Sequence, residues 1–178
     1  MTEPKDLYSC LARTAGRNPE ETSFVTGDKR LSWQEVLFSV DRAADMFWQL
    51  GLRKGDCAAI VLRNSPEFIM AWFALVKMGA VAVPINFLVS KAGEISYILE
   101  NSKACGVITE KEFVKPYAEV KKSLPALKFI ISTDFCGIDG VVDFWYYLKH
   151  AHYHPQTRLS VADEHDVATI LYTSGTTG

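Results

Sequence analysis

The last eight residues of the chain hold its densest group of side chains that could do chemistry. In order they are Leu171, Tyr172, Thr173, Ser174, Gly175, Thr176, Thr177 and Gly178. Glycines let the backbone turn tightly and present its N–H groups, and the hydroxyls between them can donate to phosphate oxygens or reach a metal ion. The segment therefore has the chemistry of a polyanion cradle. An ordinary polar turn has the same composition, so composition alone leaves both interpretations open.

The spacing of the glycines distinguishes this segment from the common P-loop. Gly175 and Gly178 lie closer together than the glycines of the G-x-x-x-x-G-K-[ST] pattern, and no lysine follows them in the sequence. If the segment binds phosphate, it does so as a different kind of loop.

Three alternating histidines form a second candidate. On a strand, His150, His152 and His154 would project from one face and could bind zinc or copper. Tyr153 and Pro155 favour a loop instead, and no cysteine or partner carboxylate lies nearby. The preferred interpretation is a surface connection with solvated histidines.

Two other clusters have a structural interpretation. The aromatic run 144–147 could stack on bases, but it lacks the basic companions and flanking pattern of nucleic-acid modules, so core packing of a short helix is expected. Lys111, Lys115, Lys121 and Lys122 are expected on the solvated face of a helix, and an anion site there is the less favoured alternative.

Composition and charge limit the classes of protein to which this chain can belong. The 178 residues are 48% hydrophobic, which suffices for one domain with a real core. The net charge of −2 provides no basic field, so no nucleic-acid partner is expected and a polyanion must be bound locally. Four scattered cysteines without a C-x-x-C pair and an N-terminus without a signal peptide favour a cytoplasmic protein.

One apolar stretch is long enough to cross a bilayer. Residues 68–89 carry a single charge, Lys77. A continuous helix there would contain Gly79 and Pro84 in its interior, which disfavours it. The stretch is therefore expected to be the core helix and strand of a β-α-β unit, with no membrane span.

Helix and strand patterns alternate along the chain. Ser32 and Glu35 have the spacing of a capping box, and Ser65 precedes another helix start. Strands are expected at 57–62, 80–84, 105–109, 128–132 and 167–172, and helices at about 33–48, 66–78, 91–100, from 116, and at 143–150. The expected fold class is α/β, a mostly parallel sheet with helices on both faces.

The expected organisation has three parts along residues 1–178. Residues 24–149 form the α/β body, 150–164 a surface connection, and 165–178 a strand followed by the phosphate-binding loop.

Segments along the chain resemble the adenylate-forming superfamily, in particular its acyl-CoA synthetases. In order they are LSWQEV, LGLRKGDCAAIVLRNSPEFIMAWFALVKMGAVAVPIN, EISYILENSKACGVIT and ADEHDVATILYTSGTTG. The final LYTSGTTG is similar to the signature loop of that family. The resemblance begins near Phe24 and implies the N-terminal part of the large AMP-binding domain.

The resemblance implies a two-step ligase reaction. ATP and a carboxylate, a fatty or similar acyl acid, give an acyl-adenylate and pyrophosphate, and coenzyme A then takes the acyl group. Thr173, Ser174, Gly175, Thr176, Thr177 and Gly178 are implied to bind the triphosphate, with Thr173 on the Mg²⁺ side. Such a loop suits the reaction because the attack brings anions together, and donors and Mg²⁺ offset that charge.

The catalytic residues of this family are expected beyond residue 178. The chain by itself is therefore expected to be inactive and to self-associate through surfaces that later residues would cover. Two alternatives remain: a non-catalytic binding module that keeps the fold, and an adenylation enzyme with another acceptor, of the peptide-synthetase or luciferase type.

Overall fold

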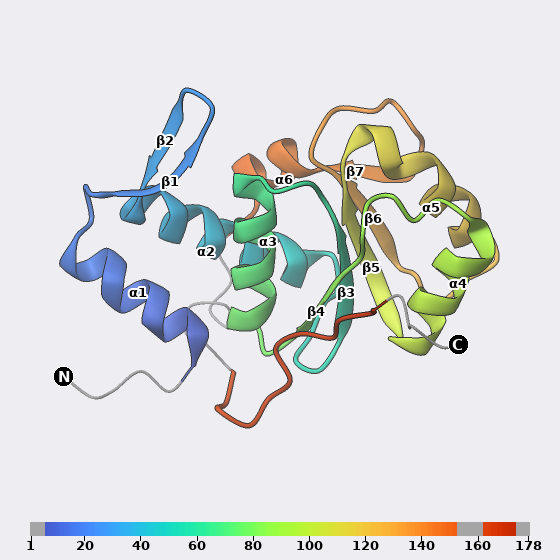
Figure 1. The fold of residues 1–178 in the computed structure, drawn as a ribbon, viewed down its shortest axis with the longest axis horizontal. Helices are drawn as coiled ribbons and strands as arrows, with labels where there is room; N and C mark the ends of the chain where they lie inside the picture. Colours follow the sequence, from blue (N-terminus) through green and yellow to red (C-terminus); the bar gives the residue numbers. More distant parts are fainter. Residues whose placement is uncertain (1–5, 153–161, 174–178) are drawn as a thin grey trace.

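The computed structural model describes residues 6–152 and 162–173, and its centre is a parallel sheet (Figure 1). The sheet has the strand order β4-β3-β5-β6-β7, and each neighbouring pair is parallel. Its strands are β3 (Cys57–Val61), β4 (Val81–Pro84), β5 (Ala104–Thr109), β6 (Phe129–Ser132) and β7 (Val141–Asp143). The parallel sheet predicted from the alternation of elements is confirmed.

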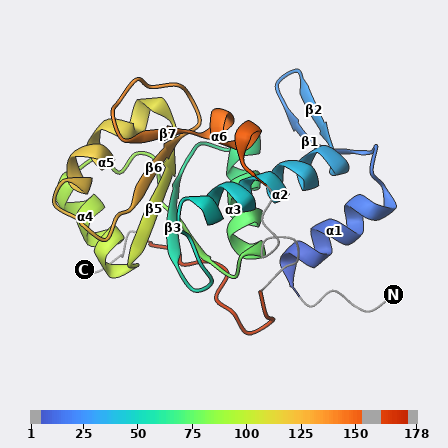
Figure 2. The ribbon, with the colours of Figure 1, turned by 180° about the vertical axis from the view of Figure 1, so that it is seen from behind.

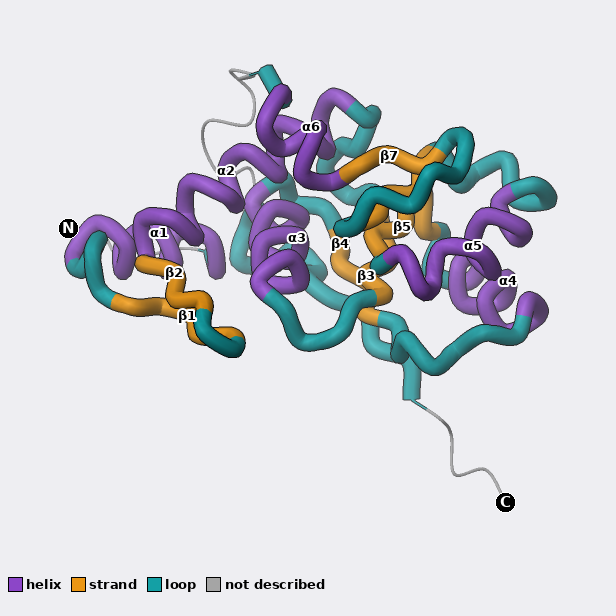
Figure 3. Tube along the Cα trace, turned by 90° about the horizontal axis from the view of Figure 1, so that it is seen from above, coloured by secondary structure: helices purple, strands orange, loops and turns teal. Residues whose placement is uncertain are grey.

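Helices cover both faces of this sheet, as expected. One face packs against α1 (Leu7–Arg17), α2 (Trp33–Gln49), α3 (Pro66–Lys77) and α6 (Phe144–His150). The other face packs against α4 (Ala92–Asn101) and α5 (Val114–Lys121), the latter preceded by the 3-10 turn η1 (Lys111–Phe113). Figure 3, seen from above, separates the two groups of helices.

Each face of the sheet has its own apolar cluster. Ala58, Ile60 and Leu62 join the first cluster with α1, α2, α3 and α6, whereas Ala59 and Val61 join the second with α4 and α5. This alternation follows from the period of two along a strand. Strand β3 is therefore buried on both sides, as central parallel strands are.

Local sequence signals explain where the helices begin and end. Ser32 and Glu35 form the predicted capping box at the start of α2. Ser65 accepts from the Phe68 amide and Pro66 occupies the first turn of α3, and Gly79, with φ of +63°, follows the C-cap of that helix. The β-α-β unit predicted for this apolar stretch is confirmed.

The hairpin of β1 (Thr22–Thr26) and β2 (Lys29–Ser32) is antiparallel and projects beside α2 (Figure 2). The helix α1, which precedes it, was not predicted. Its signal was present, since Asp6 caps the helix and Tyr8, Leu11 and Ala15 are buried at a helical spacing.

The helical period of α2 predicts that Asp41 and Asp45 face water. Asp45 is buried, so that expectation was wrong for this residue. Asp41 lies 2.8 Å from the Nζ of Lys77, which is 2% exposed, and accepts a hydrogen bond from the Tyr8 hydroxyl. The single charge of the apolar stretch is thus paired between helices. Within the described residues, no helix is long and apolar enough to cross a membrane.

Candidate functional site

The segment that leads into the predicted phosphate loop is described as far as Thr173. We call residues 162–173 the stem. Thr173 lies at its end with an exposed side chain. The other predicted loop residues, Ser174, Gly175, Thr176, Thr177 and Gly178, lie outside the described residues.

The stem runs beside β4 but forms a single bridge instead of the predicted strand over 167–172. The bridge pairs Ala82 with Thr169 in parallel. The Ala82 amide donates to the Ala168 carbonyl and the Ile170 amide donates to the Ala82 carbonyl, each at 3.0 Å.

The neighbours of Ala82 explain why pairing stops there. A longer ladder would need free amide donors that point away from β3 at the residues two before and two after Ala82. The Ala80 amide already donates to the Leu75 carbonyl at the end of α3. Pro84 has no amide hydrogen and ends the ladder on the other side.

Side chains add three further contacts to the stem. The indole Nε1 of Trp72 on α3 donates to the Thr169 hydroxyl at 2.9 Å. The Tyr172 hydroxyl donates to Oδ1 of Asn101, the last residue of α4, at 2.6 Å. The Lys54 ammonium lies 2.7 Å from the Asp166 carboxylate.

Asp166 shapes the first turn of the stem. Its carboxylate accepts from the Asp163 amide at 2.7 Å and from Lys54. The hydrogen bond from Lys54 holds the pKa of Asp166 below its ordinary value, and the hydrogen bond from the Asp163 amide makes a smaller contribution in the same direction. A cavity of roughly 260 Å³ beside this turn is lined by Asp6, Asp163, Glu164 and Asp166 among others. Its acidic lining is unsuited to a phosphate.

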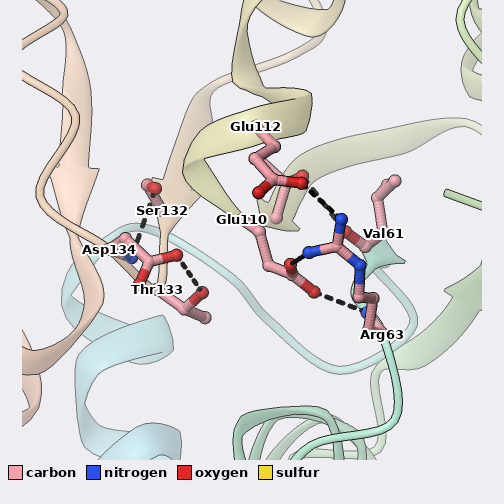
Figure 4. Close-up of polar contacts among 8 residues, drawn as sticks. Val61, Arg63, Glu110, Glu112, Ser132, Thr133 and Asp134 are labelled. Atoms are coloured by element: carbon pink, nitrogen blue, oxygen red, sulfur yellow. Dashed lines mark hydrogen bonds and ion pairs between the residues drawn. The ribbon is translucent and has the colours of Figure 1, made fainter.

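A second polar cluster lies at the carboxyl ends of β3, β5 and β6 (Figure 4). The register places Val61, Thr109 and Ser132 in one row, and the Thr109 hydroxyl donates to the Val61 carbonyl at 3.1 Å. Beyond Ser132, the Asp134 amide donates to the Ser132 hydroxyl and the Thr133 hydroxyl donates to the Asp134 carboxylate. Ligands of open parallel sheets commonly bind outside this edge.

Arg63 is the cation of this edge, and it is already engaged. Its guanidinium binds Glu110, at 2.5 Å, and Glu112, and lies 4.8 Å from the centre of the Phe113 ring. Hydrogen bonding to Glu112 raises the pKa of Arg63. The cluster is therefore net negative, because Glu110, Glu112 and Asp134 outnumber the single guanidinium of Arg63. This cluster was not predicted from the sequence, although charges directly after the predicted strands 57–62 and 105–109 must meet at one edge of a parallel sheet.

The histidine candidate does not assemble in the described residues. The Nδ1 of His150 lies 2.7 Å from the Tyr146 carbonyl, and its ring stacks on Tyr146. His152 is exposed, and His154 lies outside the described residues. Within the part that the structure describes, no three His, Cys, Asp or Glu side chains gather as a metal site.

The aromatic run on α6 is less buried than expected. Phe144 is fully buried, but Trp145, Tyr146 and Tyr147 are 45%, 60% and 37% exposed. Core packing was thus the right interpretation for Phe144 and the wrong one for the other three. A seven-residue helix lying on α2 has room to bury one narrow stripe, which Phe144 and Leu148 fill.

Comparisons with known proteins identify the family. Residues 11–178 match the AMP-binding enzyme family. A crotonobetaine/carnitine–CoA ligase from Escherichia fergusonii is 39% identical over 151 residues, which are 83% of this chain and 29% of that ligase. The ligase of the same name from Shigella dysenteriae is 38% identical over the same share of each chain. The chain therefore belongs to the AMP-binding enzymes, and it spans less than a third of the length of these relatives.

Solved structures agree with this assignment. An anthranilate CoA ligase in complex with anthranoyl-AMP superposes with a TM-score of 0.89 at 26% identity, covering 100% of this chain and 34% of that one. The N-terminal domain of FACL13 from Mycobacterium tuberculosis gives a TM-score of 0.71 at 29% identity, covering 96% of this chain and 42% of that one. The chain thus has the fold of adenylate-forming enzymes.

Proposed function

We propose that this chain provides the phosphate-binding loop of an ATP-dependent carboxylate–CoA ligase. The observation that carries the proposal is the family match over residues 11–178, which ends in the glycine- and hydroxyl-rich segment after Thr173. The named relatives act on crotonobetaine or carnitine and on anthranilate, which are carboxylates. A fatty or similar acyl acid is the substrate class proposed here, and a cytoplasmic location goes with it.

The proposed reaction has two steps. A carboxylate oxygen attacks the α-phosphorus of ATP, and the bond to the bridging oxygen breaks to release pyrophosphate. The thiol sulfur of coenzyme A then attacks the acyl carbon, loses its proton, and AMP leaves. Mg²⁺, when bound, would offset the charge of the phosphates.

The residues of this chain serve the first step in the proposal. The loop amides and the hydroxyls of residues 173–177 would donate to phosphate oxygens, and the Thr173 hydroxyl would be available to hold Mg²⁺, which would supply positive charge. The residues that supply the remaining catalytic groups lie outside this sequence in the proposal, so the 178 residues alone are inactive and tend to self-associate.

Carboxylate-dependent exchange of labelled pyrophosphate into ATP tests the proposal. It should be measured for the 178 residues alone and for the gene product read past Gly178. Exchange is expected from the longer polypeptide and not from the 178 residues. Exchange by the 178 residues alone would refute the inactivity, and its absence from the longer polypeptide would favour a non-catalytic binding module.

The hydroxyl of Thr173 is tested separately in the longer polypeptide. Thr173→Val keeps the shape and removes the hydroxyl, so exchange should fall by about 10²- to 10³-fold, as when one donor to a developing charge is lost. Thr173→Ser is the matched control and should retain most of the activity. Equal loss in both variants would contradict a role for the hydroxyl. Transfer of the acyl group to coenzyme A, measured as consumption of the free thiol, distinguishes a CoA ligase from adenylating enzymes with other acceptors.

A further inference from the structure

We propose that Trp72 and Asn101 are positioning residues that hold the stem from the two faces of the sheet and thereby place the phosphate loop. The inference rests on the proposed function of that loop. Trp72 acts through Thr169, and Asn101 acts through Tyr172.

The backbone of the stem is weakly held. Its pairing with β4 is limited to the bridge at Thr169, because Ala80 is engaged elsewhere and Pro84 has no donor. Four residues separate Thr169 from the first residue outside the described part. The position of Thr173 therefore depends on side chains of the stem rather than on a strand ladder.

The first side-chain contact fixes the bridge itself. The Trp72 ring packs on the first apolar cluster and meets the Phe73 ring edge to face, with centroids 5.0 Å apart. Such a partly buried ring is a rigid support, and its indole N–H can act only as a donor. Its hydrogen bond to the Thr169 hydroxyl ties the stem to α3 at the residue that also pairs with Ala82.

The second contact fixes the residue next to the loop. Tyr172 packs against the second apolar cluster, and its hydroxyl reaches Asn101 at the end of α4. Ile170 packs on the same cluster. Tyr172 is the neighbour of Thr173, so a displacement of Tyr172 moves the loop directly.

The two contacts lie on opposite faces of the sheet. Helix α3 belongs to the first face and α4 to the second, and Figure 1 shows the stem running from the lower end of α3 toward α4. A segment tied on both sides has little freedom to slide or rotate. Misplacement of a reacting group by about 1 Å can cost about 10²-fold in rate, which gives such positioning functional weight.

The first test uses the 178 residues and does not depend on the enzyme activity. Thr169→Val removes the acceptor for Trp72 but keeps the branched side chain, and Thr169→Ser is the matched control that retains the hydroxyl. Hydrogen–deuterium exchange at the Ile170 amide, which donates to Ala82, should become about tenfold faster in Thr169→Val and stay near the parent rate in Thr169→Ser. Unchanged exchange in Thr169→Val would overturn the proposal for Trp72.

The second contact is tested in the same way. Tyr172→Phe keeps the ring on its cluster and removes the donor to Asn101, whereas Tyr97→Phe removes an exposed hydroxyl elsewhere on α4 as a control. Exchange at the amides of residues 171–173 should accelerate in the first variant and not in the second. Equal rates in the parent and both variants would overturn the role of Asn101.

The functional consequence is measured in the longer polypeptide. Thr169→Val and Tyr172→Phe should each raise the KM for ATP about tenfold, with the KM for the carboxylate and the thermal midpoint close to the parent. An unchanged KM for ATP would overturn the positioning role. Amide exchange could become faster in the 178-residue variants while the longer parent polypeptide shows no ligase activity. That result would show that the contacts are real and that the proposed function is wrong.

Discussion

The Tyr117 side chain on α5 is buried among apolar side chains. It is fully buried in the second apolar cluster, and within the described residues its hydroxyl has no hydrogen-bond partner. Burial raises the pKa of Tyr117 above its ordinary value, and the negative charge of Glu94 makes a smaller contribution in the same direction. The folded protein therefore bears the cost of removing a hydroxyl from water without a replacement hydrogen bond.

Removing this hydroxyl should stabilise the protein. Tyr117→Phe keeps the ring and is expected to raise the free energy of unfolding by about 1 kcal/mol, because it relieves an unmet donor. Urea denaturation followed by tryptophan fluorescence measures the change. Tyr146→Phe, at an exposed side chain, should have no effect and is the control. A clear loss of stability in Tyr117→Phe would mean that the hydroxyl is satisfied in solution.

For individual residues, apolar contacts could be predicted from the sequence better than polar contacts. The stripe of Val36, Val40 and Phe47 on α2 could be placed from its period and is buried. The ion pair of Asp41 could not be predicted, because its partner Lys77 lies 36 residues away and the pairing depends on how α2 crosses α3. A helical period shows which side of one helix is polar and says nothing about a buried cation on the next.

Strands β5 and β6 are held close by a glycine that faces an aromatic ring. Gly106 pairs with Phe129 in the parallel register, and a Cβ at Gly106 would overlap the Phe129 ring. Phe129 is itself only 4% exposed, so its ring has little room to move. The glycine serves close packing here rather than a turn.

Adding a methyl group at this position should destabilise the protein. Gly106→Ala is expected to lower the free energy of unfolding by about 1–3 kcal/mol through overpacking. Combining it with Phe129→Leu should cost less than the sum of the two single changes, because the smaller side chain gives room. Urea denaturation of the four proteins of this cycle measures the coupling. Additive losses would contradict the overlap.

Elements with a long or strongly marked pattern were predictable, and short ones were not. Helices α2 and α3 and strands β3 and β5 were expected close to their observed bounds. Strand β7 has three residues, too few for a period to appear. The strand expected over 167–172 is an apolar run, but its partner β4 lacks the donors that a ladder needs.

Several thiol and phenol groups of the protein lie in buried or partly buried positions. Burial, with the nearby charge of Asp56, raises the pKa of Cys105 from 9.0 to about 11. Burial likewise raises the pKa of Cys57 and of Tyr8, the latter also through its hydrogen bond to Asp41. In each case folding favours the protonated form, so these groups stabilise the fold fully below their ordinary pKa and lose that contribution as pH rises.

Stability should therefore fall on the alkaline side. Between pH 9 and 10.5, Cys105 alone is expected to lower the free energy of unfolding by about 1–2 kcal/mol, because its unfolded form ionises first. Urea midpoints at pH 7.5, 9 and 10.5 measure the slope. Cys105→Ala should flatten the slope whatever its stability at pH 7.5, and Cys10→Ala, at an exposed thiol, should not. Equal slopes in the parent and Cys105→Ala would contradict the shift.

For the whole molecule, the family and the fold class could be predicted from the sequence. The structure describes the candidate site as far as Thr173. The glycines and hydroxyls of LYTSGTTG resemble the signature loop of the family, and their role in binding phosphate stays a prediction. The contacts of Trp72 and Asn101 with the stem could not be predicted, since these two residues lie 97 and 71 residues from their partners along the chain. Tertiary packing alone brings such residues together.

The single bridge beside β4 also limits how the sheet can grow. The outward positions at this edge are Ala80, directly before β4, and Ala82 and Pro84 within it; the amides of Ala80 and Ala82 are already engaged, and Pro84 has no amide hydrogen. The opposite edge, β7, is three residues long. Unpaired donors on a long edge strand are the usual template for adding a strand from another molecule, and short or proline-containing edges prevent it. Copies of this chain that meet in solution are therefore expected to associate through side chains and not to build a continuous intermolecular sheet along β4.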